Sequence, residues 1–340
     1  MTLKGGCLME EEDLLPLSEY VKLPTTVDFQ VINTKRFQEY AKDKPYLHFG
    51  TELANHYIIV YTNEKYIQGL LMDLGSDFLS FYPKIMSPLE SISNDQSGIT
   101  QVQNQPFLNL SGQGVIIGLV DTGIDYTKDV FRFEDGSSKV LNIWDQTVDG
   151  KRSEGLYFGT DYDNADINAA LESDDPYRLV TQTDEDGHGT FLASLAAAAE
   201  TDSYIGAAPN AYIISVKLRR ARDFYIRRYL LSQDNPNLYE SSDFLLGIKY
   251  ILDKAIEYNM PAVICIGMGD RDGVASFWNV VPSVVRYRSW WVPWPAQRTH
   301  SNIAPDSSSP LPIVTSPTDA SLAMQVSAPH VAPPSDETRA

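Results

Sequence analysis

The segment GQGVIIGLVDTGID, residues 112–125, gives the clearest indication of the fold. Residues 112–120 are short and almost wholly apolar, which is typical of a parallel strand buried on both faces. Asp121 follows directly, so a carboxylate stands at the carboxyl end of this predicted strand. Open parallel sheets bind their ligands beyond this edge. The stretch therefore predicts both a central strand and a candidate functional residue.

The segments after this strand alternate between helix and strand patterns. Residues 188–200 have Ala and Leu at helical density, and residues 242–258 carry an apolar stripe at helical spacing. Residues 211–218 and 262–269 have the composition of buried strands. This alternation predicts an α/β fold with a doubly wound parallel sheet. The long polar stretch between the first strand and the first helix shows no clear element.

The residues before this domain predict a smaller unit. Residues 56–62 and 77–83 have strand patterns, and residues 64–75 have the pattern of a helix with one apolar side. We therefore expect residues 26–95 to form a small α+β unit. Residues 96–111 are rich in Asn, Gln and Ser and predict a linker.

Both ends of the chain differ in character from these two units. Residues 1–25 are polar with scattered Leu and predict a flexible leader. Residues 270–340 hold half of the twenty prolines and show no helix or strand period. We interpret this segment as an aberrant, disordered tail that does not continue the sheet. A frame shift or truncation after about residue 269 is favoured over a genuine Pro/Ser extension, so residues 112–269 would be a partial domain.

The acidic composition of the chain excludes some classes of binding partner. The chain has 45 acidic and 27 basic residues, a formal net charge of -18 and a pI near 4.6. Such a surface repels nucleic-acid phosphates and anionic membranes, so we expect neither as a partner. The first sixteen residues carry an acidic cluster where a signal peptide needs an apolar run, and no later run reaches about 18 apolar residues. We expect a cytoplasmic protein without signal-directed export.

Asp121 and His188 are the candidate catalytic residues. A strand-end aspartate can accept a hydrogen bond from imidazole Nδ1, which fixes the tautomer and stabilises the imidazolium. The alternative is a structural aspartate that caps a turn. His188 stands between Gly187 and Gly189 at the start of the Ala-rich helix, and these small neighbours leave its ring accessible.

Four segments in this order resemble the subtilisin-like serine proteases, peptidase family S8. They are the DTGI turn, the HGTFLAS helix start, GAAPNAYIISVKL at residues 206–218 and PAVICIGMG at residues 261–269. The resemblance covers about residues 112–269. It implies a subtilisin-like fold, incomplete here, and a serine endopeptidase that acts on protein or peptide substrates without a cofactor. It also implies that Asp121 orients His188, which acts as general base and then general acid.

The resemblance gives residues 26–95 the place of the family's prodomain, an α+β intramolecular chaperone and inhibitor. The acidic composition, the missing signal peptide and the long insert between the Asp and His segments are most similar to the subtilases of clostridial spore germination. These enzymes process a cortex-lytic enzyme precursor and include pseudoprotease members. This narrower resemblance adds a spore-associated location as the alternative to the cytoplasm.

The family's nucleophile remains unknown in this chain. Neither the serine motif GTSxAxP nor a GNxG-like oxyanion segment occurs in the sequence. The most similar string is AMQVSAPHVA at residues 323–332, where Gln325 would stand in the place of the serine, and we treat this similarity as chance. Ser194 also replaces a glycine of the histidine motif. Without an activated hydroxyl no acyl-enzyme forms, so we expect this chain to be inactive.

Two other readings compete with the serine protease. DTG also marks aspartic proteases, but only one such turn is present and Ile124 follows it. A pseudoprotease that acts as a binding or regulatory protein is the second alternative. Retention of both Asp121 and His188 favours recent truncation over long-standing loss of catalysis, because a binding module would not need the pair.

We expect no metal site. An acidic group surrounds the two motifs, and solvated loop carboxylates are favoured over a calcium site because the oxygen spacing of a calcium loop is absent. This acidic group consists of Asp125, Asp184, Glu185 and Asp186. Cys7 and Cys265 are too isolated to indicate a disulfide framework or a metal centre. The arginine-rich segment 219–228 is interpreted as a loop or amphipathic surface without an assigned function.

Overall fold

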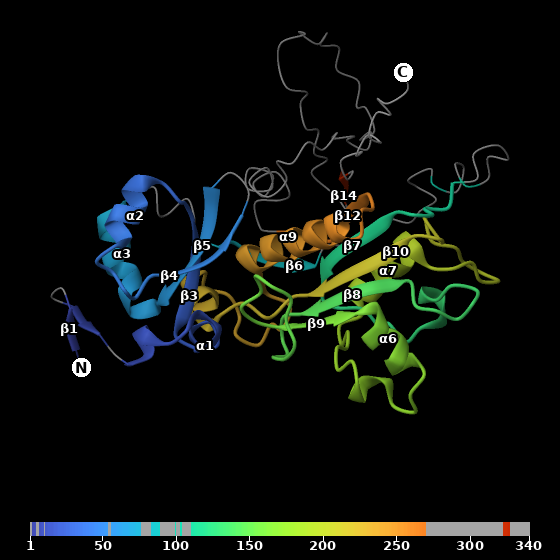
Figure 1. Cartoon of the computed structure of the whole chain (residues 1–340), viewed down its shortest axis with the longest axis horizontal. Helices are drawn as coiled ribbons and strands as arrows, with labels where there is room; N and C mark the ends of the chain where they lie inside the picture. The colour runs from blue at the N-terminus through green and yellow to red at the C-terminus, as the bar shows by residue number, and fades with distance from the viewer. Residues whose placement is uncertain are drawn as a thin grey trace, which may run out of the picture.

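The computed structural model describes residues 2–4, 7–9, 11–53, 56–75, 83–88, 99, 103, 110–269 and 322–326. Figure 1 shows a small N-terminal unit beside a larger α/β domain. The strand predicted at residues 77–83 lies outside the described residues except for Pro83. Most of the linker and most of the tail lie outside them as well. The described helices include none long and apolar enough to cross a membrane.

A six-stranded sheet forms the centre of the larger domain. Its strand order is β14-β12-β7-β10-β8-β9. The inner strands are parallel: β12 (Ala262–Ile266), β7 (Ile116–Asp121), β10 (Tyr212–Lys217) and β8 (Val140–Asp145). The edge strands β9 (Thr160–Asp163) and β14 (Leu322–Val326) run antiparallel to their neighbours.

Helices cover both faces of this sheet, as the alternation of side chains along β7 requires. Helix α9 (Ser241–Glu257) packs on one face, where a Cβ on Gly118 would lie 2.5 Å from Ile251. Helices α7 (His188–Ala197) and α6 (Asn164–Leu171) pack on the other face, on a cluster that includes Ile117 and Leu119. Figure 1 shows the sheet between these layers. The predicted doubly wound α/β fold is confirmed.

Strands β8 and β9 and helix α6 occupy the polar stretch in which the sequence showed no element. Their interior is partly polar: Asn142 on β8 is fully buried, donates to Asp161 Oδ1 at 3.3 Å and accepts from the Tyr258 hydroxyl at 2.6 Å. Such satisfied polar groups replace the apolar alternation that marks a strand in a sequence. Asp163 and Asp166 form a capping box at the start of α6.

The N-terminal unit is a three-stranded antiparallel sheet with two helices. The strand order is β3-β5-β4, with β3 at Thr26–Ile32, β5 at Tyr57–Asn63 and β4 at His48–Glu52. Helices α2 (Lys35–Ala41) and α3 (Ile67–Leu74) complete it, and the 3-10 turn η3 (Glu64–Tyr66) precedes α3. The predicted strand at residues 56–62 and helix at residues 64–75 correspond to β5 and to η3 with α3.

The N-terminal segment differs from the flexible leader predicted for residues 1–25. It contains β1 (Thr2–Lys4), β2 (Cys7–Met9), η1 (Glu11–Leu14) and α1 (Leu17–Tyr20). Tyr20 is fully buried, and its ring stacks on His48 with 3.9 Å between centroids. Asp13 is also buried and accepts a hydrogen bond of 2.5 Å from the Tyr66 hydroxyl. A few buried side chains thus hold this segment in place, although its overall polarity predicted no packed structure.

The tail also differs from its prediction, which placed no strand beyond residue 269. Leu322–Val326 forms β14, whose register on β12 runs from Ala262 opposite Val326 to Ile266 opposite Leu322. An exposed strand edge offers a row of backbone groups that any short extended segment can pair with. Residues 322–326 lack the apolar/polar alternation of a half-buried strand and lie in a proline-rich sequence, so no strand was predicted there.

The arginine-rich segment 219–228, interpreted as a loop or amphipathic surface, includes a short helix with one buried side and exposed Arg227 and Arg228, and its buried side is part of an interface. Helix α8 (Asp223–Arg228) begins after Arg222, and the Tyr225 side chain is fully buried. The Tyr225 hydroxyl donates to the backbone carbonyl of Asp28 on β3. Long amphipathic side chains make such a segment look solvated in a sequence although its apolar parts are buried.

Candidate active site

Asp121 and His188 meet at the carboxyl edge of the sheet. Asp121 ends β7 with a side chain 1% exposed, and His188 begins α7 with a side chain 15% exposed. His188 Nδ1 lies 2.7 Å from Asp121 Oδ1. The same carboxylate oxygen accepts a hydrogen bond of 2.8 Å from the Thr122 amide. The two residues that the sequence selected are therefore in direct contact, 67 positions apart.

This contact selects one imidazole tautomer. An ionised Asp121 accepts the proton on Nδ1, which leaves the lone pair of Nε2 for proton transfer from a nucleophile. Burial raises the pKa of the Asp121 carboxyl, and the hydrogen bonds from His188 and the Thr122 amide act against this rise. A buried carboxylate beside the ring also stabilises the imidazolium that a general base becomes.

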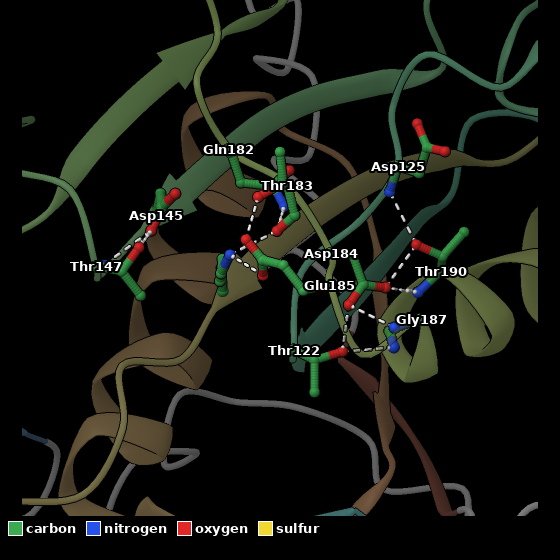
Figure 2. Close-up of polar contacts among 12 residues, drawn as sticks. Thr122, Asp125, Asp145, Thr147, Gln182, Thr183, Asp184, Glu185, Gly187 and Thr190 are labelled. Atoms are coloured by element: carbon green, nitrogen blue, oxygen red, sulfur yellow. Dashed lines mark hydrogen bonds and ion pairs between the residues drawn. The ribbon is translucent and has the colours of Figure 1, made fainter. Parts of the chain in front are cut away.

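Asp184 connects the turn after Asp121 to the start of helix α7 through hydrogen bonds. Figure 2 shows its carboxylate between Thr122, Gly187 and Thr190. Asp184 Oδ1 accepts from the Thr122 hydroxyl at 2.7 Å and the Gly187 amide at 3.0 Å. Asp184 Oδ2 accepts from the Thr190 amide at 2.8 Å and its hydroxyl at 2.6 Å. This positioning role was not predicted from the sequence, although an acidic residue four places before His188 was a usable signal.

The other members of the acidic group also have protein partners. Glu185 bonds to Lys217 at 2.9 Å, and although partial burial acts against it, the Lys217 and Thr183 hydrogen bonds lower the pKa of Glu185 to about 2. Asp125 accepts from the Thr127 hydroxyl at 2.6 Å. Asp186 accepts from Asn237 at 2.5 Å. Within the described residues no group of three or more His, Cys, Asp or Glu side chains is arranged to hold a metal ion.

The backbone approaches the Asp121–His188 pair closely at Gly267. A Cβ there would lie 3.0 Å from Asp121 Oδ2, 3.0 Å from His188 Cε1 and 2.1 Å from Leu192 Cδ1. An added side chain would clash with Leu192 and crowd the Asp121–His188 pair. Gly267 therefore belongs to the site, and nothing in its apolar sequence context distinguished it.

A strand of the N-terminal part lies directly beside this site. β6 (Ile85–Pro88) is the central strand of a small antiparallel sheet, between β11 (Tyr239–Glu240) and β13 (Met268–Gly269). Pro88 pairs with Met268, the residue after Gly267. Two short strands of the α/β domain thus hold an extended segment next to the Asp121–His188 pair.

The nucleophile is not assigned. Gln325, the residue that takes the serine's place in the weak sequence similarity, lies in β14 opposite Val263. The family's serine stands at the start of a helix, so a position within a strand agrees with the treatment of that similarity as chance. The assignment of Asp121 and His188 as catalytic residues stays a prediction.

Residues 112–232 match the model of the Subtilase family. The matched segment contains both Asp121 and His188, together with the Asp184 that joins them. The resemblance to this family is thereby supported for the segment that builds the site.

Two solved structures are similar to the chain. The CspB protease of Clostridium perfringens is 32% identical, with a TM-score of 0.41, over 51% of this chain and 32% of that one. The epidermin leader peptide processing serine protease EpiP of Staphylococcus aureus, solved as a mutant, is 14% identical, with a TM-score of 0.36, over 76% and 57% of the two chains. The chain thus spans about a third of the first protein and just over half of the second. No curated protein matches the sequence.

Proposed function

We propose that this chain carries the aspartate and histidine of a subtilase-type serine endopeptidase. In this role Asp121 holds the Nδ1–H tautomer, and His188 takes the proton of a serine and returns it to the leaving amine. The observation that carries the proposal is the 2.7 Å contact between His188 Nδ1 and Asp121 Oδ1 inside the segment that matches the Subtilase family.

The proposed substrates are protein or peptide segments bound as an extended strand. Strand addition recognises a peptide through its backbone hydrogen bonds and places alternate side chains in pockets. The position of β6 between β11 and β13 supports this mode, because a segment there runs directly toward the Asp121–His188 pair. In this proposal residues 26–95 act as a prodomain whose β6 occupies the substrate position.

We propose further that the chain, whose sequence lacks the GTSxAxP motif, does not itself hydrolyse peptides. Acyl transfer needs an activated hydroxyl, and loss of one triad member removes most of the rate enhancement. The narrower similarity to the subtilases of spore germination, with a cytoplasmic or spore-associated location, belongs to the same proposal. It rests on the sequence features already given.

The substrate position is tested by opening it. Met86 on β6 is 1% exposed, so Met86→Glu should displace β6, whereas Met72→Glu alters a side chain that is 75% exposed and serves as the control. A fluorescein-labelled peptide of residues 83–95 is titrated into each full-length variant and followed by anisotropy. We expect saturable binding to the Met86 variant alone. If that variant still melts cooperatively and binds no peptide, the proposed substrate position is wrong.

The absence of catalysis is tested on the unaltered chain. A fluorophosphonate probe reacts with activated serines and reports them without a known substrate. We expect no covalent labelling and no hydrolysis of a denatured protein substrate. Stoichiometric labelling of a serine in this chain would show that it holds a nucleophile, and would overturn the proposed inactivity while leaving the roles of Asp121 and His188 in place.

A further inference from the structure

A buried group of charges joins the N-terminal unit to the α/β domain. The Arg222 guanidinium donates from the same nitrogen, Nη1, to Asp28 Oδ1 on β3 and to Glu240 Oε2 on β11, the latter at 2.6 Å. The Arg222 amide also donates to Glu240 Oε1 at 2.6 Å. The side chains of Asp28, Arg222 and Glu240 are 1%, 10% and 0% exposed. We call these three residues the Arg222 cluster.

The charges of this cluster do not balance. Nearby, Arg219 forms two hydrogen bonds of 2.7 and 2.8 Å to Asp243 on α9, so that pair is neutral by itself. The Arg222 cluster then has one guanidinium for two carboxylates. Burying an uncompensated charge costs several kcal/mol, and a carboxyl group avoids this cost by taking a proton.

The geometry provides a place for that proton. Asp28 Oδ1 and Glu240 Oε2 both accept from Arg222 Nη1, so the two carboxyls meet at one nitrogen, and a proton on one of them removes their mutual repulsion. Among the described residues, Asp28 Oδ2 is buried and has no hydrogen-bond partner, so it is the available acceptor. Burial raises the pKa of Glu240 well above its usual range; Arg222 acts against this rise, and Asp28 and Asp243 add to it.

The remaining neighbours do not supply a compensating charge. The Tyr61 ring of β5 lies 6.0 Å from the Arg222 guanidinium, and burial raises the pKa of its hydroxyl, which therefore stays neutral. The ionisable groups around Glu240 are thus Asp28 on β3, Tyr61 on β5, Arg219 and Arg222 before α8, and Asp243 on α9.

We propose that Asp28 and Glu240 share one proton beside Arg222, and that loss of this proton at rising pH loosens the N-terminal unit from β11. Burial raises the pKa of Glu240 in the folded chain above the ordinary pKa of a glutamate. The bound proton therefore stabilises the docking of the N-terminal unit fully below that ordinary pKa. This stabilisation is lost as the pH rises through the raised pKa. Deprotonation leaves two buried carboxylates against one guanidinium.

The cluster is placed to act on the strand-binding position. Glu240 belongs to β11 and lies opposite Ile85 of β6. The next residue, Ser241, donates its amide to the Lys84 carbonyl at 2.9 Å. Loosening at Asp28 and Glu240 therefore exposes the edge of β11 to other extended segments. That last consequence rests on the proposed function, whereas the proton-dependent docking itself does not.

The test is hydrogen exchange of the full chain, read by mass spectrometry between pH 5 and 10 and corrected for the intrinsic rate. Peptides that contain β6 and β11 report the docking. Glu240→Gln keeps a donor without a titrating proton, and Glu39→Gln changes an exposed carboxylate of α2 as the matched control. We expect protection in the unaltered chain and the Glu39 variant to fall by about tenfold per pH unit, the slope for one proton, between the ordinary glutamate pKa and the raised value, and to level off above it. The Glu240 variant should show no such fall.

Two results would overturn the proposal. One is protection of β6 and β11 that does not change with pH in the unaltered chain, and the other is an equal pH dependence in the Glu240→Gln variant. If that variant does not melt cooperatively, Asp28→Asn gives the same test, because it leaves one carboxylate for one guanidinium and should also abolish the pH dependence. No readout needs peptidase activity, so failure here is distinct from failure of the proposed function.

Discussion

The Thr122 hydroxyl donates a 2.7 Å hydrogen bond to Asp184 Oδ1, and this bond connects the turn after β7 to the loop before α7. The Thr122 oxygen in turn accepts from the Gly189 amide at 2.9 Å. Asp121 and His188 each lie one residue away from this connection. Their 2.7 Å contact therefore depends on side chains that need not take part in any chemistry.

Replacement of Asp184 by Ala should destabilise the chain by about 2–3 kcal/mol, because several buried donors lose their acceptor together. Equilibrium urea unfolding measures the change. Asp174→Ala, at an exposed position, is the control and should alter the free energy of unfolding by less than about 0.5 kcal/mol. Equal effects of the two substitutions would contradict the role given to Asp184.

Gly267→Ala should both destabilise the fold, by about 1–3 kcal/mol, and disturb the site. The added Cβ has Leu192 Cδ1 at 2.1 Å and the two site residues at 3.0 Å. Gly69→Ala in α3 is the matched control: nothing lies within 4 Å of its Cβ, and alanine should stabilise that helix by about 0.5–1 kcal/mol. Opposite signs in thermal or urea unfolding are expected, and a neutral Gly267→Ala would show that the close approach is absent.

Lys139 gives a pH prediction away from the site. Its ammonium group is buried among the carbonyls of Val130, Ala197 and Pro209, and burial lowers the pKa of Lys139 to about 8. The unfolded chain then binds more protons than the folded one between about pH 8 and pH 10.4, so this residue makes stability rise with pH in that window.

The measurement is the difference in unfolding free energy between the unaltered chain and Lys139→Met, taken across pH 8 to 10.5. It should change by about 3 kcal/mol at most in favour of the unaltered chain. Lys35→Met, at an exposed position, should give a constant difference and serves as control. A constant difference for Lys139→Met as well would mean that its ammonium group is not desolvated.

The sequence was sufficient to predict an element or a contact where one physical pattern dominated. The apolar run of β7 predicted a strand buried on both faces, and its terminal Asp121 predicted a partner for His188. It was insufficient where polar groups satisfy one another inside the fold. Because of the polar Asn142, β8 was not predicted as a strand. Arg222 was predicted at the surface because its carboxylate partners, Asp28 and Glu240, lie far from it in the sequence.

The same limit applies to the site itself. Asp121 and His188 stand in short sequence patterns, so their pairing could be predicted, and the structure brings them into contact. Asp184 was grouped with solvated loop carboxylates because the sequence does not show that Thr122 and Thr190 donate to it. Gly267 matters because its missing side chain leaves room for Leu192 and the Asp121–His188 pair, and no local sequence pattern shows this.

The pairing of Asp121 with His188 is tested most directly by the tautomer of His188, measured by long-range 1H–15N correlation NMR on the full chain and on Asp121→Ala. We expect the neutral ring to carry its proton on Nδ1 in the unaltered chain and to shift toward the Nε2–H form when the carboxylate is removed. An Nε2–H ring in the unaltered chain, or a tautomer that Asp121→Ala leaves unchanged, would contradict the assignment of Asp121 and His188 as a catalytic pair.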